Sequence, residues 1–390
     1  MEKEEYQIQR ELNIRKVVII CLITIFIIAV IVIISLYIAE EGFRKWVDIN
    51  VFRKDILSEN TATIDLNVDK NNQIICFGKY IGILTEKNLK LYNQSGESIT
   101  DISVDINTAI FTQNDKYLAI AEKKGQEFCL ILDKTYLWKQ KVDGEIQQIY
   151  VNKNGYVAIV TTDTTYKSII TLYDSNGKQL LRNFMSSTRV IDVSISNDNK
   201  YLAFAEMDTS GTLIKSTIKI ISVEKASTNS NQAIVYSKEA GTSEMIVKIQ
   251  YQEKDDLICV YDDVVKAIKE NEESEAVSKD DTMSFVSGNL NNSVAYIKEE
   301  QKGIFDSSST LNIKNTTNNQ EYKYNFDEIA KEMYTYGNII GINIGTEMYF
   351  VNTNGMLIKK YVAKQEITNV MMSNNLAIII YKDRIEIINL

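Results

Sequence analysis

The sequence predicts an all-β fold, a β-propeller of about eight four-stranded blades, preceded by one transmembrane α-helix. Three observations lead to this prediction. One long apolar stretch lies near the amino terminus, a short strand pattern recurs about every 40 residues, and the repeats alternate apolar and polar side chains. Alternation with a period of two is typical of strands, and short strands repeated at this spacing are typical of propellers.

The apolar stretch runs from Val17 to Ala39, which is 23 residues. As a helix it would be about 34 Å long, enough to cross a hydrocarbon core of roughly 30 Å. The alternative is a cleaved secretory signal, whose apolar part usually has about 7–15 residues and ends at small residues. Tyr37 stands near the end of the stretch, where a cleavage site needs a small residue. The stretch therefore favours an uncleaved anchor.

Charges beside the anchor predict its orientation. Arg15 and Lys16 precede the stretch, and Glu40 and Glu41 follow it. Positive flanks stay in the cytoplasm, so we expect a cytoplasmic tail at 1–16 and a helix at 17–39. A juxtamembrane linker at 40–60 and an extracytoplasmic propeller at 61–390 would follow. The alternative is a reversed anchor with the body in the cytoplasm.

Composition excludes several classes of function. The chain has 390 residues, a net charge of −9, no histidine and no proline. The acidity lies in the body, so we expect no nucleic-acid partner, because phosphate binding needs a basic surface. Without histidine, Ser-His and Cys-His catalysis and the usual zinc sites are absent. We assign no catalytic, cofactor-binding or metal-binding residue and expect no cofactor.

The cysteines are far apart in the sequence. Cys21 lies in the apolar stretch, while Cys76, Cys129 and Cys259 lie in strand-like runs. No two of them form a Cys-x-x-Cys pair. We interpret the last three as small buried side chains, with a disulfide between two of them as the alternative.

The recurring pattern is a strand with a small or apolar residue at its centre. Clear copies are Tyr117–Ala121, Tyr156–Val160 and Tyr201–Ala205, and weaker ones are Ser293–Ile297 and Asn375–Ile379. More distant copies are Tyr80–Leu84, Asp256–Val260 and Ile340–Ile342. These copies predict eight blades, or seven if one weak copy is misread. A central Ala or Gly is expected where neighbouring blades pack face to face.

Turns and a closing strand complete the predicted blades. Three copies continue into Asn-x-x-Gly or Asp-x-x-Gly turns, ending at Gly96, Gly177 and Gly355, where glycine supplies a positive φ. The last copy supplies only three strands before Leu390. We expect the fourth from Thr61–Leu66 at the start of the body, which would close the ring and remove its exposed edges.

One repeat resembles a known family. Residues Ser196–Ala205 read SNDNKYLAFA and are similar to the SPDGKYLAFA repeat of WD40-like and TolB-type propellers, with Asn in place of Pro and Gly. The layout also resembles an uncharacterised family of single-span bacterial propeller proteins, over nearly the whole chain. The resemblance implies a propeller fold and a cell-envelope location, and it carries no activity.

Candidate sites are few. An acidic run comprises Glu270, Glu272, Glu273, Glu275, Asp280 and Asp281. We interpret it as the solvated outer edge of a blade, because charge runs usually face water. The longest interruptions of the repeat are Glu224–Glu244 and Lys298–Ser309. The second contains Ile304 and Phe305, which either contact a partner or fold back onto their own blade.

The predicted function is binding. We expect a membrane-anchored module that contacts lipid through one helix and binds an envelope protein or a glycan such as a wall polymer. The alternative is a propeller hydrolase or lyase that uses carboxylates facing the central channel.

Overall fold

The computed structural model describes residues 14–40, 43–44, 47, 51–52, 57–58, 61–66, 72–228, 232–242, 244–301, 307–373 and 375–390. The chain divides into two compact units, Met1–Ile56 and Leu57–Leu390. Each unit is described by itself.

The first unit contains helix α1 (Ile14–Ala39). Its 26 residues correspond to about 39 Å of helix, and Val18–Ala39 is apolar enough to cross a membrane. The polar hydroxyl of Thr24 donates to the carbonyl of Ile20, four residues earlier, at 2.9 Å. A hydroxyl satisfied within its own helix is compatible with an apolar environment. Both a membrane span and a signal sequence have these properties.

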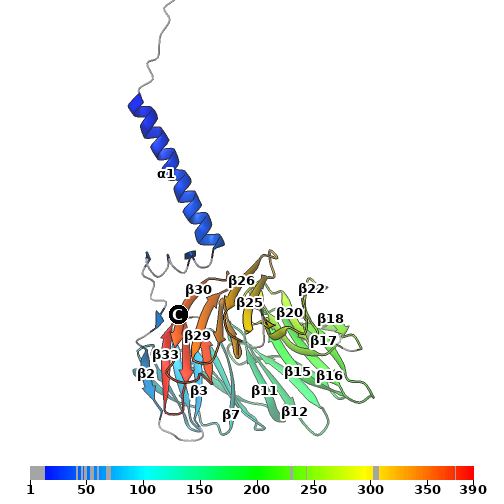
Figure 1. Ribbon diagram of the computed structural model, residues 1–390. Helices are drawn as coiled ribbons and strands as arrows, with labels where there is room; N and C mark the ends of the chain where they lie inside the picture. The colour runs from blue at the N-terminus through cyan, green and yellow to red at the C-terminus, as the bar shows by residue number, and fades with distance from the viewer. Residues whose placement is uncertain are drawn as a thin grey trace, which may run out of the picture. The chain divides into compact units, whose positions relative to one another are not determined.

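The second unit is a closed propeller of eight antiparallel blades, as the repeats predict (Figure 1). Blade 1 consists of β3 (Gln73–Phe77), β4 (Tyr80–Leu84), β5 (Asn88–Tyr92) and β6 (Ser98–Ser103). Blade 2 consists of β7 (Ala109–Asn114), β8 (Tyr117–Glu122), β9 (Glu127–Leu132) and β10 (Thr135–Lys141). Blade 3 consists of β11 (Glu145–Val151), β12 (Val157–Thr162), β13 (Ser168–Tyr173) and β14 (Gln179–Met185). Blade 4 consists of β15 (Thr188–Ile195), β16 (Tyr201–Asp208), β17 (Lys215–Ser222) and β18 (Ile234–Glu239).

The remaining blades follow the same order. Blade 5 consists of β19 (Ile246–Tyr251), β20 (Leu257–Tyr261), β21 (Val264–Lys269) and β22 (Glu272–Ser278). Blade 6 consists of β23 (Met283–Ser287), β24 (Ser293–Gln301), β25 (Ser307–Asn315) and β26 (Glu321–Phe326). Blade 7 consists of β27 (Glu332–Tyr336), β28 (Ile339–Asn343), β29 (Glu347–Asn352) and β30 (Leu357–Val362). Blade 8 consists of β31 (Val370–Ser373), β32 (Leu376–Ile380), β33 (Arg384–Asn389) and the closing strand β2 (Ala62–Asp65).

The ring closes as predicted. Strand β2 pairs antiparallel with β33, with Ile64 opposite Ile385, and in Figure 1 blue β2 lies beside red β33. The first strands β3 and β31 also pack on each other, which joins blades 1 and 8. A second short strand, β1 (Leu57–Ser58), pairs in parallel with β30 of blade 7. The segment that enters the propeller is therefore hydrogen-bonded to two adjacent blades. The pairing of β2 with β33 was expected, and the pairing of β1 with β30 was not.

The hydrophobic core lies between the blades. Eight clusters of buried side chains occur among the described residues, and each joins one blade to the next. The predicted small residues lie at these contacts: Ala119, Ala158, Ala203, Ala295 and Ala377 are 0% exposed. A Cβ added to Gly341 of blade 7 would lie 2.9 Å from the sulfur of Met372 in blade 8. Close approach of neighbouring sheets therefore requires these small residues.

The turns follow their sequence signal. Gly96, Gly177 and Gly355 have positive φ, and in the first of these turns the side-chain oxygen of Asn93 accepts from the backbone N–H groups of Ser95 and Glu97 at 2.9 Å each. Gly96 also approaches the closing strand. A Cβ there would lie 2.8 Å from the carbonyl oxygen of Thr63.

The cysteines form no disulfide. All four are free, and Cys76, Cys129 and Cys259 are buried, which confirms their interpretation as small buried side chains. Burial raises the pKa of Cys76 and of Cys129 to about 12.

Candidate functional site

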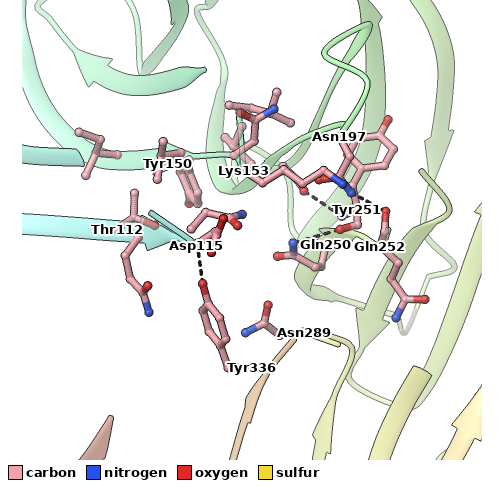
Figure 2. Close-up of a pocket in the computed structure, with 18 of the residues that line it drawn as sticks. Thr112, Asp115, Tyr150, Lys153, Asn197, Gln250, Tyr251, Gln252, Asn289 and Tyr336 are labelled. Carbon is pink, nitrogen blue, oxygen red and sulfur yellow. Dashed lines mark hydrogen bonds between the residues drawn. The ribbon is translucent and has the colours of Figure 1, made fainter. Parts of the chain in front are cut away.

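The first strands of six blades end around one cavity of about 750 Å³. Its lining comes from β7, β11, β15, β19 and β27 and from the turns that follow them, together with the turn after β23. Among the described residues, blades 1 and 8 contribute none to the lining. Figure 2 shows Asp115, Gln250, Asn289 and Tyr336, from four different blades, around a common space. This cavity is the candidate functional site, because ligand sites are concave and few.

Hydrogen bonds between blades hold the turns around the cavity. The Asn152 Nδ2 donates to the carbonyl of Ser196 at 3.0 Å, which joins blade 3 to blade 4. The Asn197 Nδ2 donates to the carbonyl of Gln252 at 2.7 Å, which joins blade 4 to blade 5. The Gln252 Nε2 then donates to the carbonyl of Ser293 in blade 6 at 2.7 Å. Amide side chains bridge blades well because each has both donors and an acceptor.

A tyrosine closes the remaining side of the cavity. The hydroxyl oxygen of Tyr336, in blade 7, accepts from the backbone N–H of Asp115, in blade 2, at 2.6 Å (Figure 2). This bond joins blades 2 and 7, which lie on either side of blades 8 and 1, and no described residue of blades 8 and 1 belongs to the lining. Burial raises the pKa of Tyr336 to about 12, so the hydroxyl keeps its proton at neutral pH. Because its oxygen is occupied by an N–H group, that proton can be donated to a ligand.

Other amides retain hydrogen-bonding capacity. The Gln113 Nε2 donates to the carbonyl of Met372 at 3.3 Å, whereas its Oε1 is buried without a partner among the described residues. Among the described residues, the Gln250 Nε2 donates only to the carbonyl of the adjacent Tyr251, at 3.1 Å. A buried acceptor without a partner costs free energy, which a bound donor would recover.

Charges in the lining are balanced. Two cations, Lys153 and Lys248, occur with two carboxylates, Asp115 and Glu253. Lys248 Nζ lies 3.2 Å from Oδ1 of Asp192, a buried carboxylate whose other oxygen accepts from the N–H of Ile249 at 2.9 Å. Burial and the Asp192 carboxylate raise the pKa of Tyr150, so its ring is neutral. The cavity therefore presents neutral polar groups with little net charge.

The lining offers limited chemistry. The hydroxyl oxygen of Ser194 accepts from the N–H of Tyr251 at 2.9 Å, and the chain has no histidine to activate it. The two carboxylates in the lining, Asp115 and Glu253, come from blades 2 and 5 and are the residues that a channel hydrolase would use. Within the described part of the chain, no group of three His, Cys, Asp or Glu residues could hold a metal ion. The arrangement is suited to reversible binding of a polar molecule.

The residues singled out from the sequence fall in two groups. Arg15, Lys16, Val17 and Ala39 belong to helix α1, and Ile304 and Phe305 lie outside the described residues.

Two interpretations of sequence segments need correction. The interruption Glu224–Glu244 contains part of helix α3 (Val223–Thr228) and all of β18, so it supplies the fourth strand of blade 4 rather than a long loop. In the acidic run, Glu273 is not solvated, because its side chain is 9% exposed and pairs with Lys238 and with Lys266. It lies on strand β22, where alternation places it on the opposite face from Glu272 and Ser274. The other five acids are exposed, as predicted.

The sequence interpretation missed the cavity amides. Gln113, Gln148 and Gln250 lie on first strands, close to the turns that follow. A search for polar residues at this position of each repeat would have found them.

These observations define the class of protein as a closed eight-bladed β-propeller with a polar cavity at one end of its central channel. The profile described as "Family of unknown function (DUF5711)" matches residues 56–390, so the chain belongs to that family. No curated protein shows significant sequence similarity to this chain.

Solved structures resemble the propeller in fold. BamB from Moraxella catarrhalis has a TM-score of 0.48 and 12% identity, covering 84% of this chain and 96% of that chain. A structure described as the eukaryotic initiation factor has a TM-score of 0.51 and 9% identity, covering 85% and 94%. The Pan2 WD40 domain of Neurospora crassa has a TM-score of 0.45 and 10% identity, covering 72% and 88%. At such low identities these similarities describe the fold alone.

Proposed function

We propose that this protein is a membrane-anchored, extracytoplasmic binding or scaffolding module whose propeller binds an envelope protein or a wall polymer. The observation that carries the proposal is the polar cavity of about 750 Å³ in a closed propeller that follows an apolar helix. Its lining is held by amides and tyrosines and has no histidine-activated nucleophile. Such a site favours binding over catalysis.

The proposed orientation places the amino terminus in the cytoplasm and the propeller outside. Support comes from Arg15 and Lys16 before the apolar stretch and from Glu40 and Glu41 after it. The helix would contact lipid along its length, because its side chains between Val18 and Ala39 are not buried against protein.

Topology is tested by labelling with a membrane-impermeant maleimide in intact spheroplasts. Ser210, in the exposed turn between β16 and β17, is replaced in the variant Ser210→Cys. The propeller's own three cysteines are buried and give little background. We expect labelling of Ser210→Cys before lysis, and labelling of a matched tail variant, Glu5→Cys, only after lysis. The opposite pattern would place the body in the cytoplasm and refute the proposal.

Binding is tested by cross-linking in intact cells, followed by purification of the full-length protein. We expect recovery of a specific envelope protein or wall polymer. Variants then show whether the partner binds at the cavity. In that case capture is lost when cavity residues are changed and is kept when exposed residues of the outer strands are changed. Recovery of neither a protein nor a polymer would refute a binding role.

A further inference from the structure

The cavity is surrounded by amide side chains, with at least one from each of five consecutive blades. These residues are Gln113, Gln148, Asn197, Gln250 and Asn289. A carboxamide can donate and accept hydrogen bonds at the same time, because its NH₂ group and its carbonyl oxygen lie a few ångströms apart at most. A pair of adjacent hydroxyl groups on a sugar ring has the complementary arrangement, because each hydroxyl also donates and accepts.

Two of these amides have capacity for a ligand. The Oε1 of Gln113 is buried without a partner in the described part of the chain. Where the structure describes the chain, the Nε2 of Gln250 bonds only within its own strand, to Tyr251 at 3.1 Å. Figure 2 shows this side chain directed toward the space that Asn289 and Tyr336 also face. Gln250 therefore offers a polar group to a molecule in the cavity, and Gln113, which also lines the cavity, carries an acceptor whose hydrogen bond is not made.

The charges disfavour an anionic ligand. Lys248 is compensated by Asp192 at 3.2 Å, and Lys153 occurs with two carboxylates, those of Asp115 and Glu253, in the same lining, which leaves one excess negative charge. A polyanion would need a cationic excess, which this lining lacks. Tyr336 adds an apolar ring face beside a hydroxyl, the combination that positions small polar ligands in pockets.

We propose that the cavity binds a neutral oligosaccharide, with Gln113 and Gln250 as hydrogen-bonding residues and Tyr336 as a wall of the site. The inference rests on the proposed function, because it names the ligand class of the same propeller. A volume of about 750 Å³ is within the usual range for small ligands and suits a short oligosaccharide or the end of a longer chain. A peptide carries similar hydrogen-bonding groups, but it presents them more sparsely than a sugar presents hydroxyls.

The test uses the purified full-length protein in lipid nanodiscs and measures affinity by calorimetry. The probes are neutral oligosaccharides (chitotetraose, cellotetraose and maltotetraose), an acidic oligogalacturonate and a library of uncharged peptides. We expect saturable binding of at least one neutral oligosaccharide. The variants Gln250→Leu and Gln113→Leu should each weaken it about tenfold, through loss of hydrogen bonds to the sugar.

The matched control is Gln179→Leu, which removes an exposed amide on the outer strand β14 of blade 3. It should leave affinity unchanged, and all three variants are first checked for wild-type melting temperatures. If Gln113→Leu fails to fold, Gln250→Leu, whose amide bonds only within its strand, still tests the site. The proposal is overturned if the protein binds none of the neutral sugars, binds only the acidic sugar or binds only peptides. It is also overturned if Gln179→Leu loses as much affinity as the cavity variants.

Failure of this inference is separable from failure of the proposed function. Sugar binding by purified protein does not depend on membrane orientation, so a cytoplasmic body would refute the proposed function alone. An extracytoplasmic body that captures an envelope protein, but binds no neutral oligosaccharide, would refute only the sugar assignment.

Discussion

The closing strand β2 provides a quantitative test of the ring. Ile64 is its buried side chain, 5% exposed, and packs in a cluster with side chains of blades 8 and 1 that include Ile385 and Ile81. Replacement by Ala leaves the backbone pairs of β2 with β33 in place but opens a cavity between these blades. An Ile→Ala change in a core costs about 2–5 kcal/mol. We expect Ile64→Ala to destabilise the propeller by an amount in this range.

The expected change in melting temperature follows from the size of the unit. Unfolding entropy is about 2.1 cal/mol/K per residue, so for Leu57–Leu390 a loss of 1 kcal/mol lowers Tm by roughly 1.4 °C. Ile64→Ala should therefore lower Tm by roughly 3–7 °C. Thermal unfolding of full-length protein in nanodiscs, followed by circular dichroism in the strand region, measures this shift.

The matched control lies one residue away. Thr63 is exposed on the same strand, so Thr63→Ala should change Tm by no more than about 1 °C. If Ile64→Ala and Thr63→Ala melted alike, at the wild-type temperature, the closing strand would not belong to the cooperative unit. The reasoning about ring closure would then be refuted.

Three further predictions concern other contacts. Gly96→Ala should destabilise the propeller by about 1–3 kcal/mol in urea unfolding, because φ is +79° and a Cβ would lie 2.8 Å from the Thr63 carbonyl oxygen. Gly211→Ala should have little effect, because a Cβ there would make only ordinary contacts, the nearest at 3.7 Å from the carbonyl oxygen of Leu213. Tyr336→Phe should speed hydrogen exchange at the backbone amide of Asp115 severalfold or more, because that amide loses its hydrogen-bond acceptor. The control Tyr322→Phe, which removes an exposed hydrogen bond to Gln320, should leave this rate unchanged. Equal exchange rates in Tyr336→Phe and the wild type would contradict the hydrogen bond between Tyr336 and Asp115. The buried thiols should make the protein less stable in alkali: burial raises the pKa of Cys76 to about 12, so above pH 8.5 the unfolded chain loses a proton that the folded chain keeps. Stability present below that pH is lost as the pH rises toward 12, and this thiol accounts for a loss of about 2 kcal/mol at pH 10. Between pH 8 and 10, the urea midpoint of Cys76→Ala should therefore fall less than that of the wild type.

Much of the fold was predictable because its signals are local. Strand alternation, the Asn93–Gly96 type of turn and the small central residue of each repeat act over a few neighbouring positions. Repetition of these signals predicted the blades. The last repeat has three strands instead of four, and this predicted a closing strand from the start of the body. The parallel strand β1 had no comparable signal, because Leu57–Ser58 is too short to show alternation.

The candidate site was not predictable in the same way. Asp115 and Tyr336 are 221 positions apart and meet only because the ring brings blades 2 and 7 to the same channel. Gln113 and Met372 are 259 positions apart and are joined for the same reason. Within its own repeat, Gln113 is one polar residue near a turn. Its importance depends on the five other blades whose side chains line the same cavity.

The sequence by itself therefore determined a long apolar helix and a closed ring of eight blades, because each strand and turn is specified by residues close to it. Only the tertiary structure decided which polar side chains meet in the channel, which of them bridge blades and which are left with hydrogen-bonding capacity. Those properties depend on how six blades pack around one axis. Distances between residues far apart in the chain are set by that packing and not by local periodicity.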